Sequence, residues 1–379
     1  MRARLVCALG AEEMNLTLIA AAESSSAPLD EHQVLLLLIQ LLALVGLARL
    51  LGGLMKRIGQ PSVVGELLAG VVLGPSLFGK IAPAAYEWVF TDEPVVTSTV
   101  FGFAWLGVIM LLVVIGFETD LAIIRRFAKA AIFVSAGSLL IPLATGVTMG
   151  LLAPESFRGE GADPGIFAGF FALALAVSAL PVVAKILLDL GFLRRNFGQI
   201  TLAAGMTMDS VGWLLLAALA GISRENRLDL PNLARSIGGL ALFLILAATV
   251  GRWGIDQTLK RIMASGSSTA AALTITLLAA ITGAMVTQAL ELEAILGAFI
   301  VGILLATTRH QVVSVRDSIE NLTAAFFAPI FFAFSGLRVD IGALASAEAA
   351  LWAFGVVVVA ILAKVGGTYI GARLGGLDR

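Results

Sequence analysis

An aspartate, Asp209, stands in the middle of an apolar stretch that runs from about residue 198 to residue 222. A stretch of this length can span a bilayer. An ionisable group at its centre costs a few kcal/mol or more, so such groups usually face a cavity and take part in function. An ionised carboxylate attracts a cation and a protonated one releases it, so protons and metal cations compete for the same group. This competition is sufficient for exchange if the carboxylate faces the two sides in turn. The alternative is a structural carboxylate bonded to a hydroxyl group on a neighbouring helix.

A second intramembrane charge, Lys364, lies in the apolar segment 349–374. We expect it to act as a counter-charge near Asp209 that leaves when a cation arrives. In the alternative interpretation its long side chain extends toward the nearer interface. The neighbours of Asp209 that are expected to support the site are Thr207, Met208 and Ser210.

A third feature is the segment 176–185, which contains Ser178 and Pro181. A proline inside a helix removes a backbone donor and frees a carbonyl one turn earlier, and Ser178 adds a hydroxyl. Broken helices in transporters offer such groups to ions at mid-membrane. The segment therefore predicts a broken helix that supplies auxiliary ligands, with a simple proline kink as the alternative. Charges nearer to helix ends are expected to form structural or gating salt bridges, and they are Glu66, Glu118, Asp120 and Lys185.

The composition identifies the class of protein. Of 379 residues, 59% are hydrophobic and only 13% are charged, with a mean hydropathy of +0.98. A soluble domain would carry about a quarter charged residues, so the chain is an all-α polytopic membrane protein that contacts lipid. The single cysteine, Cys7, excludes a disulfide framework, and no metal-ligand spacing surrounds His32 or His310. No nucleotide fingerprint and no serine–histidine pair occurs in the apolar segments, so we expect no enzyme, cofactor, transition metal or nucleic-acid partner.

About eleven apolar segments are predicted to span the membrane, at 33–55, 62–79, 98–117, 128–153, 165–190, 198–223, 234–254, 269–290, 292–308, 320–337 and 349–374. Alternate loops collect lysine and arginine, which favours a cytoplasmic location for them. These loops include Lys56, Arg125, Arg194 and Arg316. We therefore expect a multi-pass protein of the cell inner (plasma) membrane, with an extracytoplasmic leader at 1–32, one transmembrane domain at 33–379, the N-terminus outside and the C-terminus inside.

Two short stretches each recur later in the chain, in the same order but in spans of opposite orientation. Residues 64–70 (VGELLAG) resemble 296–302 (LGAFIVG), and residues 116–121 (GFETDL) resemble 336–341 (GLRVDI). The members of each pair are seven predicted spans apart in chain order, an odd number, so the copies have opposite orientations, as in many secondary transporters. We predict a first repeat at about 62–223 and a second repeat at about 292–379. The second repeat is expected to be incomplete, because it contains only three predicted spans between residue 292 and Arg379, whereas the first contains five.

The same stretches, together with 177–187 (VSALPVVAKIL), Asp209 with Trp213, and 329–332 (PIFF), resemble the monovalent cation:proton antiporter-2 family. This family includes the Kef-type and NapA-type proteins, and the subgroup that looks most similar is the plant-type cation exchangers. The resemblance implies a homodimer that transports Na⁺ or K⁺ against H⁺, with Asp209 as the carrier, Lys364 opposite it and Ser178 as a hydroxyl ligand. Family members usually have Asp, Asn or Gln where this chain has Met208, and they continue through two more helices.

We therefore expect an inverted-repeat antiporter fold with a broken crossing helix, which exchanges a monovalent cation for a proton by alternating access. The single carboxylate of the Asp209 motif favours one proton per cation, hence electroneutral exchange. The alternatives are a non-transporting membrane sensor or scaffold, a degraded relative, and an antiporter of another substrate such as a small metabolite.

Overall fold

The computed structural model describes residues 29–90, 93–159, 161–225, 230–264, 269–308 and 313–377. Most of the predicted leader, with Cys7, and also His310 and Arg379 lie outside the described residues. In the part that is described, all regular elements are helices. The longer ones are α2 (Glu31–Arg57), α3 (Ser62–Leu73), α6 (Pro94–Phe117), α8 (Ala128–Leu152), α9 (Pro164–Ala176), α10 (Leu180–Asp189), α11 (Asn196–Glu225), α12 (Leu230–Leu246), α13 (Arg252–Ala264), α14 (Thr269–Ala289), α15 (Ala294–Thr307), α16 (Val313–Leu322), α17 (Ala328–Leu337) and α18 (Ala347–Leu374). Shorter helices are α4 (Phe78–Ile81), α5 (Pro83–Val89) and α7 (Leu121–Arg126).

The helices confirm a multi-pass membrane protein. Within the described residues, ten helical segments are long and apolar enough to cross a bilayer, and α15 is a shorter apolar helix. Together they cover the eleven predicted spans, although α12 with α13 extends beyond the predicted end. Two of the spans contain a π-helical turn, at Ala247–Gly251 between α12 and α13 and at Thr323–Phe327 between α16 and α17.

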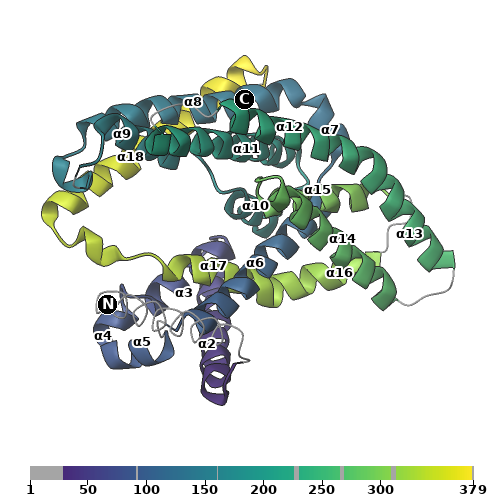
Figure 1. Cartoon of the computed structure of the whole chain (residues 1–379), viewed down its shortest axis with the longest axis horizontal. Coiled ribbons are helices and arrows are strands. Elements are labelled where there is room, and N and C mark those ends of the chain that lie inside the picture. Colours follow the sequence, from purple (N-terminus) through teal and green to yellow (C-terminus); the bar gives the residue numbers. More distant parts are fainter. Residues whose placement is uncertain are drawn as a thin grey trace, which may run out of the picture.

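The helices form two bundles, which Figure 1 shows one above the other. The upper bundle contains α8, α9, α11 and α18, and α10 descends from it to pack against α3 and α6. The lower bundle contains α2, α3, α6, α14, α15, α16 and α17. The long helix α12–α13 runs along one side of both bundles (Figure 1). Asp209, on α11, therefore belongs to the upper bundle.

Close packing in the upper bundle depends on small residues that face each other. A Cβ atom on Gly137 of α8 would lie 2.2 Å from the carbonyl oxygen of Gly367 on α18. A Cβ atom on Gly146 of α8 would lie 2.5 Å from the Cα atom of Ala172 on α9. Small residues are how membrane helices approach closely when lipid offers no hydrophobic driving force. Helix α8 is thus held between α9 and α18.

The lower bundle contains the two recurring stretches, and their glycines make equivalent contacts. Gly70 of α3 faces Gly336 of α17, and Gly302 of α15 faces Gly116 of α6. The first stretch pairs Gly70 with Gly302, and the second pairs Gly116 with Gly336. If each glycine is replaced by its counterpart in the other copy, the first contact becomes the second. This is the packing that an inverted repeat requires.

The correspondence extends one helix further than the sequence indicates. A Cβ atom on Gly65 of α3 would lie 2.3 Å from the backbone of Leu51 on α2. A Cβ atom on Gly297 of α15 would lie 2.0 Å from the carbonyl oxygen of Gly283 on α14. Both members of the second contact lie 232 positions after their counterparts in the first. Helices α2 and α14 are thus equivalent as well.

The predicted broken helix is present in the upper bundle. Helix α9 ends at Ala176, and α10 begins at Leu180, with extended backbone at Val177 and Ala179 between them. Pro181 occupies the first turn of α10, where proline is tolerated because that N–H has no helical partner. The proline therefore begins a second half-helix and does not kink a continuous one.

The glycine contacts generate a prediction for stability. Gly116→Ala places a Cβ atom 2.4 Å from the carbonyl oxygen of Phe299. We expect a loss of about 1–3 kcal/mol from overpacking, measured as a lower midpoint of thermal unfolding of the purified protein in detergent. The matched control is Gly102→Ala in the same helix, where nothing lies within 4 Å of the added atom. Equal midpoints for the two variants would contradict the packing described here.

Candidate functional site

Asp209 is half-buried near the middle of α11 and lines two cavities. Cavity 1 has a volume of about 280 Å³ and lies against α11, α12 and the turn before α15. Cavity 2 has a volume of about 350 Å³ and lies between α6, α17 and the start of α10. Their walls are mostly apolar, as Leu240 in cavity 1 and Phe331 in cavity 2 illustrate. The carboxyl group thus faces cavities and not lipid, as expected for a working intramembrane acid.

Both cavities reach the surface at the same end of the molecule. Exposed Glu291 lines cavity 1, and exposed Arg338, which follows α17, lines cavity 2. We call this the Arg338 end. The opposite end, where α6 and α10 finish and α11 begins, is called the Glu118 end. Asp209 is therefore reached from the Arg338 end in this conformation.

Glu293 meets Asp209 across the two bundles. It directly precedes α15 in the lower bundle, and it shares with Asp209 the lining of both cavities. The two carboxyl groups are hydrogen-bonded to each other, and the side chain of Trp213 is hydrogen-bonded to Glu293. Among the residues that line the cavities, Asp209 and Glu293 alone belong to both. The sequence interpretation did not identify Glu293.

The break between α9 and α10 lies beside this pair. Ala179 and Pro181 line cavity 2 together with Asp209, and Ser178 lies in the break itself. Helix α10 has no side-chain cap, so its first N–H groups and the positive end of its dipole are directed toward this region. A carboxylate nearby is favoured by that field. Of the neighbours of Asp209, Ser210 lines cavity 1, whereas the hydroxyl of Thr207 donates to Ala203 O at 2.9 Å within its own helix.

Lys364 does not meet Asp209 through any recorded contact in the described residues. Its Nζ atom donates to the carbonyl oxygen of Ser138, at 3.1 Å, and to that of Ala176. Ala176 ends α9, so the ammonium group neutralises the carbonyl end of a half-helix. The expected direct opposition of Lys364 and Asp209 is thus replaced by a contact with the broken helix.

Met208 is buried on the same side of α11 as these carbonyls. Its sulfur accepts a hydrogen bond from the hydroxyl of Ser138 at 2.8 Å, and it packs with Leu139 and Ala176. A thioether is a weak acceptor, and sodium and potassium prefer hard oxygen ligands. In this structure Met208 therefore has a packing role beside Asp209 and is a poor candidate for a cation ligand.

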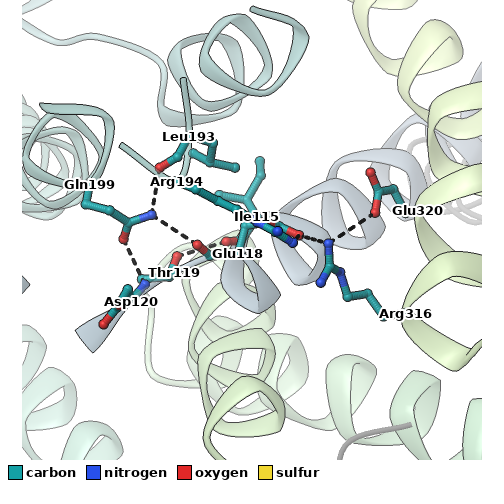
Figure 2. Close-up of polar contacts among 9 residues, drawn as sticks. All are labelled: Ile115, Glu118, Thr119, Asp120, Leu193, Arg194, Gln199, Arg316 and Glu320. Atoms are coloured by element: carbon teal, nitrogen blue, oxygen red, sulfur yellow. Dashed lines mark hydrogen bonds and ion pairs between the residues drawn. The ribbon is translucent and has the colours of Figure 1, made fainter. Parts of the chain in front are cut away.

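The Glu118 end is closed by two ionic clusters, of which the Glu118 cluster is shown in Figure 2. Glu118 follows α6, and its buried carboxylate pairs with Arg194 and with Arg316. Nη2 of Arg194 donates to the Oε1 atom of Glu118 at 3.0 Å. Arg194 precedes α11 in the upper bundle, whereas Glu118 and Arg316 belong to the lower bundle. One carboxylate therefore joins the two bundles.

Gln199 of α11 completes the Glu118 cluster (Figure 2). It is fully buried, and its Nε2 atom donates to Glu118 O at 3.0 Å and to Leu193 O at 2.7 Å. Its Oε1 atom accepts from the backbone N–H of Asp120 at 2.8 Å. The Asp120 carboxylate accepts from Ala122 N and Ile123 N at the start of α7. In the described part of the chain Asp120 thus acts as a helix cap, not as a partner in the expected salt bridge.

The second cluster, the Asp189 cluster, joins α10 to α3. Lys185 Nζ lies 2.6 Å from Asp189 Oδ1 and donates to Ser62 Oγ at 3.1 Å. Asp189 Oδ2 accepts from the backbone N–H of Ser62 at 2.9 Å and from its hydroxyl at 2.6 Å. Helix α3 has no side-chain cap of its own, so Asp189 caps it from the other bundle. Glu66 is buried beside this cluster, and one of its carboxylate oxygens has no hydrogen-bond partner.

The roles expected for Glu118 and Lys185, salt bridges near helix ends, agree with these contacts. Sequence reasoning did not find their partner Asp189 or the buried Gln199, since both lie at segment ends among ordinary polar residues. It also missed Glu293. The available signal is weak, because this acid is the second residue of the predicted span 292–308, where an acid usually faces water.

The sequence model of the family described as "Sodium/hydrogen exchanger, transmembrane" matches residues 41–379. The chain belongs to the sodium/hydrogen exchanger family. Proteins of this family are transporters and not enzymes.

Relatives within the exchanger family include the Na(+)/H(+) antiporter NhaS4 of Synechocystis sp., which is 30% identical over 358 residues, or 93% of this chain and 85% of that protein. Cation/H(+) antiporter 17 of Arabidopsis thaliana is 28% identical, over 91% of this chain and 41% of the relative. K(+)/H(+) antiporter 1 of Saccharomyces cerevisiae is 29% identical, over 84% of this chain and 40% of the relative. The chain thus spans less than half of the plant and yeast proteins.

A solved structure of the sodium proton antiporter MjNhaP1 from Methanocaldococcus jannaschii, at pH 8, has the same fold. The TM-score is 0.54 at 15% sequence identity, over 88% of this chain and 79% of that chain. This likeness and the glycine contacts confirm the predicted inverted-repeat antiporter fold with a broken helix.

The Glu118 cluster generates a second prediction. Glu118→Gln removes the buried charge that holds Arg194 and Arg316. These arginine side chains are 66% and 29% exposed, so the cost lies below the about 3–5 kcal/mol of breaking a fully buried pair. We therefore expect the Glu118 end to open more often. The readout is the rate of thiol modification of a fully buried reporter on α10, Ala184→Cys, in a chain in which Cys7 is replaced by serine. The rate should rise about tenfold or more.

The control for this measurement is Glu320→Gln. Glu320 lies 3.8 Å from the same arginine, Arg316, but it contacts it from the same helix, α16. Its loss should leave the modification rate close to that of the parent. The same rate in both variants would show that Glu118 does not hold the bundles together.

Proposed function

We propose that the chain is a secondary antiporter that exchanges a monovalent cation, Na⁺ or K⁺, for H⁺ across a membrane by alternating access. The observation that carries the proposal is the position of Asp209. Its carboxyl group faces cavities that reach one end of the molecule, while ionic clusters close the other end. A carrier site needs this one-sided access, because a site open at both ends is a channel.

The mechanism follows from the chemistry of one carboxyl group. From the Arg338 end, a cation replaces the proton of Asp209, and the ionised carboxylate holds the cation in its place. The carbonyls and the hydroxyl of the break near Ser178 supply additional oxygen ligands, which suit Na⁺ and K⁺. The loaded upper bundle then moves relative to the lower bundle, the Glu118 end opens, and a proton displaces the cation.

Lys364 has a role that differs from direct competition at Asp209. Its ammonium group stays on the carbonyl end of α9 and stabilises the broken helix while the cation enters and leaves. Met208 next to the carrier adds no charge, so Asp209 is the one carboxylate within the apolar stretch 198–222. With one proton exchanged for one cation, transport is electroneutral.

The relatives support a monovalent cation and leave two choices of ion, since their names specify sodium in one case and potassium in another. We further propose that residues 33–379 form one transmembrane domain with the predicted repeats at about 62–223 and 292–379, each extended by one preceding helix, α2 and α14, for which the glycine contacts are the support. The lysine and arginine residues at the Glu118 end favour its cytoplasmic location in the plasma membrane. A homodimer is proposed from the resemblance to the antiporter family.

The carrier role is tested by Asp209→Asn in proteoliposomes that report internal pH. Asparagine neither ionises nor carries a proton at ordinary pH, so Na⁺- and K⁺-driven pH changes should disappear. The control is Asp163→Asn. Asp163 is exposed and caps α9, and asparagine caps as well as aspartate. Flux retained by Asp209→Asn would refute the proposal.

Electroneutral exchange is tested with the unmodified protein. A membrane potential should not change the initial rate of cation-driven proton movement, because each cycle moves no net charge. The rate is measured at zero potential and at potentials of both signs imposed by a potassium gradient with valinomycin, using Na⁺ as the driving ion. A current that follows the applied potential would show a different stoichiometry.

A further inference from the structure

The contact between Asp209 and Glu293 joins two carboxyl groups that belong to different bundles. Both residues line both cavities, so they stand where the cavities meet. An ionised carboxylate accepts hydrogen bonds but cannot donate one. A hydrogen bond between the two groups therefore requires a proton between them.

This proton occupies a place that suits a cation. When the proton leaves toward the Arg338 end, two carboxylates face each other at close range, and like charges at that distance repel. A monovalent cation between them relieves the repulsion and gains hard oxygen ligands from both sides. The pair carries one net negative charge with the proton and one with the cation. The exchange of one proton for one cation is therefore balanced at this site.

We propose that Glu293 is a second ligand of the transported cation, contributed by the lower bundle and available only while Asp209 faces the Arg338 end. This inference rests on the proposed antiport function, and it deepens it by assigning a ligand outside the helix that carries Asp209. When the upper bundle moves, Asp209 leaves Glu293 behind. The cation site consequently has an additional carboxylate on one side of the membrane and lacks it on the other.

The position of Glu293 is fixed by the packing of α14 against α15. The turn between the helices is tight, with Leu292 N bonded to Thr287 O at 3.0 Å and Glu291 in a left-handed conformation at φ 58°. Gly283 and Gly297 bring the two helices into backbone contact. The side chain of Trp213 approaches Glu293 from the upper bundle and orients its carboxyl group. The backbone of Glu293 is therefore held by the lower bundle, whereas Trp213 belongs to the upper bundle and moves with Asp209.

The other charged residues that line the cavities do not replace this ligand. Glu291 is exposed at the mouth of cavity 1, and its side chain lines that cavity alone. Arg338 lines cavity 2, where its guanidinium lies 5.3 Å from the ring centroids of Phe101 and Phe334. Neither residue lines both cavities. Glu291 therefore provides a matched control two positions from Glu293.

The test measures the apparent affinity for Na⁺ and for K⁺ from each side of the membrane. Right-side-out and everted vesicles that contain the full chain are supplied with either salt, and the pH change in the lumen gives the half-saturating concentration. For Glu293→Gln we expect this concentration to rise about tenfold or more from the Arg338 end, which is the loss of one charged ligand. From the Glu118 end it should remain within about twofold of the parent value.

Three variants separate the possible results. Glu291→Gln should match the parent from both sides. Glu293→Asp keeps the charge on a shorter side chain, so it should show a smaller one-sided loss, and it serves if the glutamine variant does not fold. Asp209→Asn should abolish exchange from both sides, and if it does not, the antiport proposal itself fails. If Asp209→Asn is inactive while Glu293→Gln is unchanged, or is weakened equally from both sides, the assignment of Glu293 is wrong and the antiport proposal stands.

Discussion

The structure depends on how charged groups are accommodated where two helical bundles meet inside a membrane. Water is scarce at such a junction, so every charge needs a partner that is already part of the protein or a transported ion. At one end the partners are permanent, because Arg194 and Arg316 neutralise Glu118, and Lys185 neutralises Asp189. In the site that we propose at the other end the partner is exchangeable, because a hydrogen bond between the carboxyl groups of Asp209 and Glu293 requires a proton. The same physical requirement therefore produces a closure at one end and a binding site at the other.

The bundles themselves are held together differently from the junction. Within each bundle, backbones approach closely at glycine contacts such as Gly137 with Gly367 and Gly116 with Gly302. The two helices cannot slide past each other at these contacts, because a shift would bring a side chain of one helix against the backbone of the other. Between the bundles, the contacts at the Glu118 end are made by side chains, and side chains can change partners. In the proposed mechanism each bundle therefore moves as a unit, and the polar contacts between the bundles determine when it moves.

Much of the fold could be predicted from the sequence, because the apolar segments are long and their boundaries carry charge. The broken helix was visible from Pro181, and the repeat was visible from glycines whose spacing is preserved in both copies. The equivalence of α2 and α14 was not visible, since Leu51 and Gly283 differ in type and only their contacts correspond.

The candidate site was predicted in part. A carboxylate in mid-membrane is conspicuous, so Asp209 could be identified from the sequence alone. Glu293 could not be identified in this way, because an acid at the edge of a hydrophobic segment usually faces water. Its approach to α11 is set by tertiary packing. Lys364 illustrates the opposite difficulty. A lone lysine suggests an acidic partner, but the backbone carbonyls of Ser138 in α8 and of Ala176 at the end of α9 bind it instead.

The two clusters at the Glu118 end differ in their exposure to solvent. The side chain of Arg194 is 66% exposed, whereas Lys185 and Asp189 are only 5% and 6% exposed. Exposed ion pairs are weakened by dissolved salt much more than buried ones. Arg194 should consequently detach first, while α10 is still anchored at Ser62 by the carboxylate that caps α3. Once Arg194 has detached, the upper bundle in the proposed mechanism first tilts about the Ser62–Asp189 contact. The upper bundle is translated only after that contact also breaks.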